Sequence, residues 1–490
     1  MKTIRFFSIM FFSFVVFQTN AQVVNFFKDN IYNLKYNPAS EITVRSHFSL
    51  LPVLNNFDLL AGTNILTYND VVSSDAEGNK EINPKGLFSR ISKGSSYGEI
   101  ALNMNAELLG FGFKVGKKSY LTFSSRLRME NTFFIPKGLF QFVSDGNLSH
   151  IDEEMSIIPL VSMLGYLDNS IGLQYKLTDK ITLGARGKIL MGIFGANIKE
   201  GWMLKTDSEW NWHLKGSALA TLYFPRALMN DISGNISLTN IGSIFDFSKI
   251  NANTILNSLT SSWGGGFDVG IDVKLPLNFG VKASLIDMGW IKWNRNQQGA
   301  SSYRMSLNPN HPLYQNEELV FSGMSFDEVS TLFLKGSNLI EDDFSQLVKE
   351  MGLDTVFLFS EAVSEKYVMS TNPKLFMEGY YQWKSHKLSA LMRLDFVEKK
   401  ALPTFTLAYN LNIKKLVDIA LCYSMAKGSY RNLGMGISLN PGNVFHFYVA
   451  TDNLFTFFFP LANNYVNIQA GLYFSSPVKK PKKQEETIEP

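Results

Sequence analysis

A period of two in the apolar side chains is the feature of this sequence that most constrains its fold. From Phe267 to Leu275 every odd-numbered residue is apolar, and the even positions hold Asp268, Gly270, Asp272 and Lys274. Successive side chains of a β-strand point to opposite faces, so this pattern predicts a strand with one apolar and one polar face. The same alternation recurs at 171–178, 404–413 and 432–439. The sequence therefore predicts an all-β protein.

The first residues have the layout of a secretory signal peptide. Lys2 and Arg5 precede the apolar run 6–17, and small or polar residues at 19–21 form a cleavage site. The run is too short to cross a bilayer as a helix. We expect residues 1–21 to be removed and the mature protein to begin at Gln22. A buried N-terminal strand or helix is the disfavoured alternative.

Composition narrows the class of exported protein. Cys422 is the single cysteine, which excludes an intramolecular disulfide framework. A net charge of +3 with 18% charged residues gives no reason to expect nucleic acid as a partner. No apolar run after the signal is long enough for a transmembrane helix. A closed barrel pairs every backbone group within a bilayer, so we predict a Gram-negative outer-membrane β-barrel. A soluble periplasmic all-β protein is the alternative.

The connections between predicted strands alternate between short and long, as an outer-membrane barrel requires. With both termini in the periplasm, the long external connections fall near 223–261 and 296–370. The short periplasmic turns are predicted at 116–119, 178–180, 206–208, 275–277, 384–386, 413–415 and 440–442. The count is about 14 strands, within a range of 14 to 16.

Four segments follow from this interpretation. Residues 1–21 are the signal peptide, 22–60 a plug or first strand, 61–474 the barrel, and 475–490 a disordered periplasmic tail. Within the second long connection, 340–352 has helical spacing, and Ser325 and Glu328 have the spacing of a capping box. These features predict a partly helical extracellular cap.

Three short motifs resemble a known family. Tyr36-Asn37-Pro38-Ala39 resembles the start of the hatch in fatty-acid-transporter-like (FadL-like) barrels. The hairpin of 266–275 and 279–287, and the C-terminal pattern from Tyr448 to Phe474, resemble a domain-of-unknown-function branch of those barrels. The resemblance implies about 14 strands and an N-terminal plug containing Asn37, Pro38 and Ala39. It also implies uptake of hydrophobic molecules or an adaptor role in secretion.

Strand parity selects the polar side chains that should face the lumen. They are Arg126, Arg128, Glu130, Arg186, Lys188, Asp268, Asp272, Lys274, Lys282, Arg393 and Asp395. Opposite charges in a narrow barrel can cross-link the wall and hold a plug, so a structural lattice of ion pairs is the favoured interpretation. A path for a ligand or an ion is the alternative.

Nothing in the sequence indicates an enzyme. His213 and His446 lie on polar faces of predicted strands, but no Gly-x-Ser-x-Gly or His-Glu-x-x-His motif accompanies them. We therefore predict no catalytic residue, no metal and no cofactor.

The apolar segment 454–461 is unusual for a connection between strands. Phe455, Phe457, Phe458 and Phe459 make it apolar on both parities, which a solvated loop should not be. It could enter lipid, fold over the lumen, or capture an apolar ligand or a protein partner.

The first functional hypothesis is capture or passage of hydrophobic small molecules. The rival is a non-transporting adaptor or scaffold that docks a secreted or surface protein, and a general diffusion porin is third. Outer-membrane lipids and the barrel-assembly machinery are expected partners in every case.

Overall fold

The computed structural model describes most of the protein from residue 22 to residue 477. The described residues are 22–28, 30–52, 54–63, 72–74, 80–82, 97–138, 150–157, 160–223, 253, 256, 259, 262–293, 301–322, 356–361, 368–397, 400–426, 429–458 and 465–477. The predicted signal peptide, the capping-box residues Ser325 and Glu328, the predicted helix at 340–352 and the tail beyond Pro477 lie outside them.

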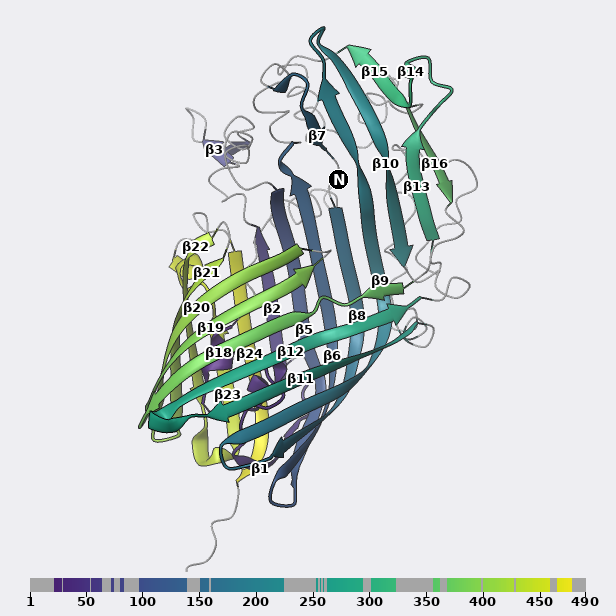
Figure 1. Ribbon diagram of the computed structural model, residues 1–490. Helices are drawn as coiled ribbons and strands as arrows, with labels where there is room; N and C mark the ends of the chain where they lie inside the picture. Colours follow the sequence, from purple (N-terminus) through teal and green to yellow (C-terminus); the bar gives the residue numbers. More distant parts are fainter. Residues whose placement is uncertain are drawn as a thin grey trace, which may run out of the picture.

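The described strands form a closed antiparallel barrel of 14 strands, which lies within the predicted range (Figure 1). β1 and β2 together form the first wall strand, because both pair with β5 and β24. The wall consists of β1 (Val44–Ser49) with β2 (Asn56–Thr63), β5 (Tyr97–Val115), β6 (Ser119–Pro136), β8 (Leu160–Lys176), β9 (Ile181–Thr206), β11 (Trp263–Lys274), β12 (Phe279–Lys292), β18 (Lys374–Trp383), β19 (His386–Val397), β20 (Lys400–Ile413), β21 (Val417–Ala426), β22 (Ser429–Leu439), β23 (Phe445–Thr451) and β24 (Tyr465–Pro477).

The outer face of the wall is apolar and the inner face is polar. Ile171, Leu388 and Leu407 point outward with exposed fractions of 61%, 55% and 58%. Asp268 and Asp272, on the opposite face of β11 from Phe267, are buried. Such an outer surface suits hydrocarbon, and the closed sheet leaves no unpaired edge in it. In the part of the protein that the structure describes, no helix has the length and apolar character needed to cross a membrane.

The short turns lie at one end of the barrel, which we call the short-turn end. They connect β5 to β6, β8 to β9, β11 to β12, β18 to β19, β20 to β21 and β22 to β23. Leu277 and Gly442 adopt the left-handed backbone that tight turns require. The predicted turn at 206–208 is the exception, and its assignment to this end is wrong. β9 begins at the short-turn end, so Thr206 lies at the opposite, long-connection end.

β9 explains this difference, because it is much longer than a wall strand. Its first half, 181–191, pairs with β11, and its second half, 195–206, pairs with β10 (Asn211–Tyr223). β10 then pairs with β13 and β15, not with the wall strand β11. β10 is therefore a strand of a second sheet beyond the rim, and the wall has 14 strands, not 16.

We call this second region the outer sheet. Figure 1 shows β9 and β10 rising past the barrel rim beside β13–β16. Its other strands are β7 (Glu154–Ser156), β13 (Ser301–Leu307), β14 (Tyr314–Gln315), β15 (Glu318–Ser322) and β16 (Phe357–Glu361). β17 (Val368–Ser370) pairs with the end of β12, and β3 (Val72–Ser74) with β4 (Lys80–Ile82) forms a separate hairpin.

The face assignment of β11 makes a testable prediction. Ile271→Arg places a cation on the outward face and should lower the yield of folded barrel, because a lipid-facing cation near mid-bilayer costs about 2–4 kcal/mol. Asp272→Asn keeps an acceptor for the Tyr380 hydroxyl and should fold far better. Heat-modifiable gel mobility of the membrane fraction measures the folded yield. Equal yields would show that the two faces are assigned wrongly.

Candidate functional site

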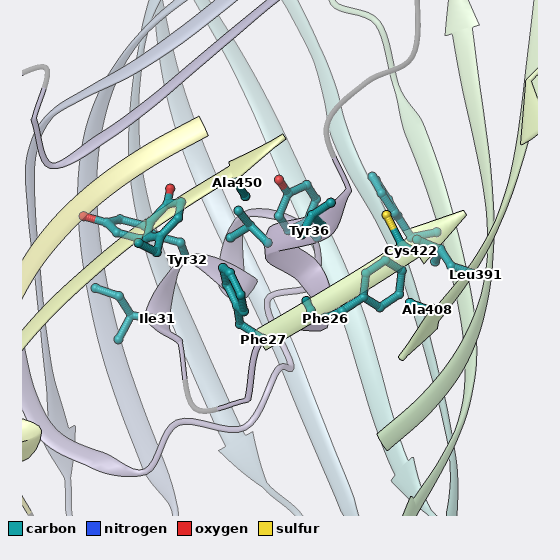
Figure 2. Close-up of a cluster of buried hydrophobic side chains, with 14 of the residues drawn as sticks. Phe26, Phe27, Ile31, Tyr32, Tyr36, Leu391, Ala408, Cys422 and Ala450 are labelled. Atoms are coloured by element: carbon teal, nitrogen blue, oxygen red, sulfur yellow. The ribbon is translucent and has the colours of Figure 1, made fainter. Parts of the chain in front are cut away.

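The segment between Gln22 and the first wall strand lies inside the barrel, and we call it the N-terminal segment. It contains two short 3-10 helices, η1 (Val23–Phe26) and η2 (Ile31–Lys35). Figure 2 shows their aromatic and aliphatic side chains against wall residues that include Leu391, Ala408, Cys422 and Ala450. Burial of this apolar surface stabilises the contact between the N-terminal segment and strands in the C-terminal half of the barrel.

Polar groups of the wall hold the backbone and side chains of the N-terminal segment. The Lys28 N–H donates to Asp418 Oδ2 at 2.6 Å, and Lys35 Nζ lies 2.6 Å from Asp58 Oδ2. Burial lowers the pKa of the Lys35 ammonium, and the Asp58 carboxylate opposes that shift. The segment is therefore held by hydrogen bonds and by charge as well as by apolar contact.

Asn37, Pro38 and Ala39 dock where the wall strands carry glycine. A Cβ at Gly184 of β9 would overlap the Pro38 carbonyl carbon, and one at Gly270 of β11 would overlap Asn37 Oδ1. The Asn37 amide donates to the Ile271 and Ala283 carbonyls at 3.1 and 3.3 Å. Glycine within a strand often marks such a close backbone approach.

Asp287 is the centre of the charged lumen. Its carboxylate accepts two bonds from the Arg128 guanidinium, one of them 2.7 Å long. Lys188 Nζ lies 2.7 Å away and Lys374 Nζ 3.0 Å away. Three cations from β6, β9 and β18 therefore converge on one anion of β12.

Parity reasoning missed Asp287, and a β-bulge explains why. Its odd number places it with the outward residues Phe279 and Val281. The β11–β12 pairing shifts register beside it, and Asp287 has a left-handed backbone with φ 61°. The bulge turns the carboxylate inward and reverses the parity of the rest of β12. An aspartate tolerates this conformation better than most residues, which is the only sequence signal for the site.

Further acids extend the network around Asp287. Asp168, also missed by the sequence analysis, lies 3.5 Å from both Arg128 and Lys188 and 3.4 Å from Arg126. Asp268 lies 2.8 Å from Lys188. The remaining contacts are Arg186 with Asp268 at 3.2 Å, Lys374 with Glu130 at 3.0 Å, and Arg128 with Glu130.

A second charged cluster lies nearer the short-turn end. Glu378 accepts bonds from Lys387 at 2.7 Å and from the Asn25 amide at 3.3 Å. Lys282 Nζ lies 3.9 Å from Asp272, which also accepts a hydrogen bond from Tyr380. Neither Glu378 nor Lys387 was among the predicted lumen residues.

The predicted lumen residues fall into four groups in the structure. The Asp287 network contains Arg126, Arg128, Glu130, Arg186, Lys188 and Asp268. Asp272 and Lys282 belong to the second cluster, and Arg393 pairs with Asp395 at 2.7 Å. Lys274 lies at the short-turn end, where its half-exposed ammonium is 2.6 Å from Glu41.

Three cavities inside the described part of the barrel are small or charged. One of about 80 Å³ is lined by charged groups that include Arg128, Asp287 and Lys374. One of about 40 Å³ lies between Tyr32 and Glu107. A third, of about 370 Å³ near the short-turn end, is lined by several lysines and by Glu41 and Asp272. A hollow of about 830 Å³, lined by Leu388 and Leu407, lies on the outward face instead.

The wall is interrupted between β1 and β2. Leu51 and Leu54 project there with exposed fractions of 43% and 64%. Asn55 closes the gap: its amide donates to the Leu108 carbonyl at 3.2 Å, and its own carbonyl accepts from Leu472 N at 2.8 Å. The facing stretch of β5 carries a register shift between Glu107 and Leu109. The 40 Å³ cavity lies directly inside this break.

The histidines lie in structural surroundings. His213 lies between Asp207 and Glu318 in the outer sheet, at 2.9 and 3.0 Å. His446 lies between Asn440 Oδ1 and Ser475 Oγ, each at 2.8 Å. That order resembles a catalytic triad, but Ser475 is only 4% exposed and leaves no room for a substrate carbonyl. Among the described residues, no group of three His, Cys, Asp or Glu side chains is placed to hold a metal ion.

The phenylalanine-rich segment is partly described. Residues 455–458 form a short helix, α10 (Phe455–Phe458), after β23. Phe455 and Phe458 are exposed, at 41% and 68%. The side chain of Phe457 and all of Phe459 lie outside the described part.

Comparison with known proteins identifies the family but not the function. No curated protein matches this one. The structure is similar to a TodX deltaS2S3 mutant monoaromatic hydrocarbon channel, with 12% identity, coverage of 92% of this protein and 95% of the channel, and a TM-score of 0.42. A Pseudomonas aeruginosa FadL homologue gives 9% identity, 94% and 99% coverage and a TM-score of 0.32. Similarities this low carry no argument about what the protein binds.

The sequence itself matches one family over residues 38–452, most of its length. That match confirms the resemblance to a domain-of-unknown-function branch. The protein belongs to DUF5723, a family of unknown function.

Proposed function

We propose that this protein is a closed outer-membrane barrel that serves as an adaptor, with the N-terminal segment as its plug and the outer sheet as its docking surface. The observation that carries this proposal is the network around Asp287. Ion pairs join β6, β8, β9, β11, β12 and β18 across the lumen. The short-turn end then faces the periplasm and the outer sheet faces outward.

The lumen chemistry opposes free passage of apolar molecules. An apolar cavity of about 150 Å³ is known to hold benzene. The cavity beside Asp287 has about 80 Å³ and charged walls. Opening it would separate buried ions from their partners, and breaking a buried pair costs about 3–5 kcal/mol. The order of the two sequence-based hypotheses is therefore reversed in this proposal.

The outer sheet supplies a surface suited to a secreted or surface protein. Exposed ion pairs, Lys205 with Asp152 at 2.9 Å and Lys215 with Glu154, give this region groups of both charges. Trp210 is 52% exposed at the tip of the β9–β10 hairpin, and tryptophan is enriched among residues that dominate protein interfaces. The hydrogen bond from His213 lowers the pKa of the Asp207 carboxyl to about 2, so the turn beside Trp210 stays anionic at neutral pH.

One observation favours the hydrophobic-capture hypothesis as a second candidate. The break between β1 and β2 carries exposed Leu51 and Leu54 on the outward side and a small cavity on the inward side. An apolar molecule in the membrane could enter there without crossing the Asp287 network. Phe458 of the partly described loop offers a further apolar surface at the long-connection end.

The closed lumen predicts the behaviour of the purified barrel in a planar bilayer. The wild-type protein should show no steady conductance, whereas Asp287→Ala should open a leak, because three cations lose their shared acceptor. Asp152→Asn, which removes an exposed pair in the outer sheet, is the matched control and should leave conductance unchanged. Steady wild-type conductance would contradict the closed-barrel proposal.

The docking surface can be mapped by photo-crosslinking in living cells. A photoreactive residue in place of Trp210 should give a discrete protein adduct, because this side chain is exposed beyond the rim. The same residue in place of Leu388, on the lipid-facing wall, should give lipid adducts only. The adaptor proposal fails if the two positions give the same protein adducts.

The second candidate makes a different prediction. If the β1–β2 break captures apolar molecules, changing Leu51 and Leu54 to Ser should reduce binding of a fluorescent fatty acid without reducing folded yield. Leu277→Ser, in the exposed turn between β11 and β12, serves as the control. Unchanged binding in the double variant, or no binding to wild type, would remove this candidate.

A further inference from the structure

We propose that the Asp452 carboxylate is a buried binding site for a primary α-ammonium group, and that its ligand is the amino terminus of the mature protein at Gln22. The proposal does not depend on the function of the barrel. It depends on cleavage after Ala21, which the first residues of the sequence predict.

The geometry places the Gln22 nitrogen directly on the carboxylate. Gln22 N donates to Asp452 Oδ2 at 2.7 Å, and Val23 N donates to Asp452 Oδ1 at 3.0 Å. Gln22 and Asp452 are each 1% exposed. The backbone nitrogens of two consecutive residues thus each donate to one oxygen of the same buried carboxylate.

Wall residues around Asp452 also hold Gln22, the first residue of the mature protein. Thr406 Oγ1 donates to Gln22 Oε1, which keeps the side-chain amide directed toward β20. A Cβ at Gly434 of β22 would lie 2.7 Å from Val23 Cγ2 and 3.0 Å from Asp452 Cα. The glycine therefore leaves the space in which the first residues and Asp452 meet.

Charge makes the ammonium a better ligand than a peptide N–H. Asp452 lies one residue beyond β23, and burial raises the pKa of its carboxyl to about 7, although the two backbone N–H groups lower it. A buried carboxylate is stabilised by an opposite charge within hydrogen-bonding distance. Cleavage after Ala21 turns the Gln22 amide into an ammonium at that distance. Removal of the signal would therefore secure the N-terminal segment inside the barrel.

The test measures the reactivity of the α-amine in the full-length protein purified from outer membranes. An amine-reactive reagent is applied to folded and to unfolded barrel, and the N-terminal peptide is examined by mass spectrometry. The peptide should begin at Gln22 with a free amine, and labelling should be about tenfold slower in the folded protein. Equal labelling of the two forms, or a mature protein that begins elsewhere, would overturn the proposal.

Two variants distinguish the ammonium site from general burial. Asp452→Asn should abolish most of the protection while the barrel remains heat-modifiable. Asp418→Asn is the matched control, because Asp418 also accepts a backbone hydrogen bond from the N-terminal segment, but from the Lys28 N–H and not from the first two residues. The control should keep the protection, and loss of protection in both variants would show that Asp452 has no specific role.

A third variant inserts one alanine between Ala21 and Gln22. The mature amine then lies one residue away from Asp452 and should lose its protection, although Gln22 keeps its backbone N–H. A wild-type terminus found as pyroglutamate would also overturn the proposal. In that reaction the amine attacks Gln22 Cδ, the bond from Cδ to Nε2 breaks and ammonia leaves, so no ammonium remains to pair with Asp452.

Discussion

The pairing of ionised groups in the lumen is the interaction on which the rest of this structure depends. Charged groups buried inside a barrel require partners of opposite charge. Asp287 meets this requirement by binding Arg128, Lys188 and Lys374 at once. Each of these cations also contacts a second acid, so the network joins the strands as a unit.

The N-terminal segment fills the remaining volume by a different means. Its aromatic side chains pack on wall residues such as Leu391 and Ala450, while the wall carries glycine where the segment approaches most closely. Gly184 and Gly270 accommodate Asn37 and Pro38, and Gly434 accommodates Val23. The barrel wall and the N-terminal segment therefore have complementary shapes at both ends of the segment.

The two functional hypotheses, docking of a protein and capture of an apolar molecule, involve different parts of this barrel. A lumen that is crossed by ion pairs and contains the N-terminal segment is compatible with a barrel that presents a surface, and β9 and β10 extend beyond the rim. The break between β1 and β2 is where the wall departs from regular pairing. Docking and lateral capture thus involve different residues, Trp210 for one and Leu51 with Leu54 for the other.

Much of the architecture could be predicted from the sequence, because the alternation of apolar and polar residues is a local property of each strand. That alternation predicted the antiparallel barrel, the strand number within its range, and inward positions such as Arg128 and Asp268. The alternation did not reveal that β9 and β10 leave the wall, because a strand that joins a second sheet alternates in the same way as a wall strand. It also failed at Asp287, because the β12 bulge turns inward a residue whose parity places it with the outward side chains.

By itself, then, the sequence determined which segments become strands and which face of each strand is polar, since a period of two encodes both. Only the tertiary structure decided which charges meet. The convergence on Asp287 depends on one bulge and on strands distant in sequence, and the contact of Gln22 with Asp452 joins residues 430 positions apart. Long-range pairing depends on barrel closure and register, and neither is encoded in the residues next to the site.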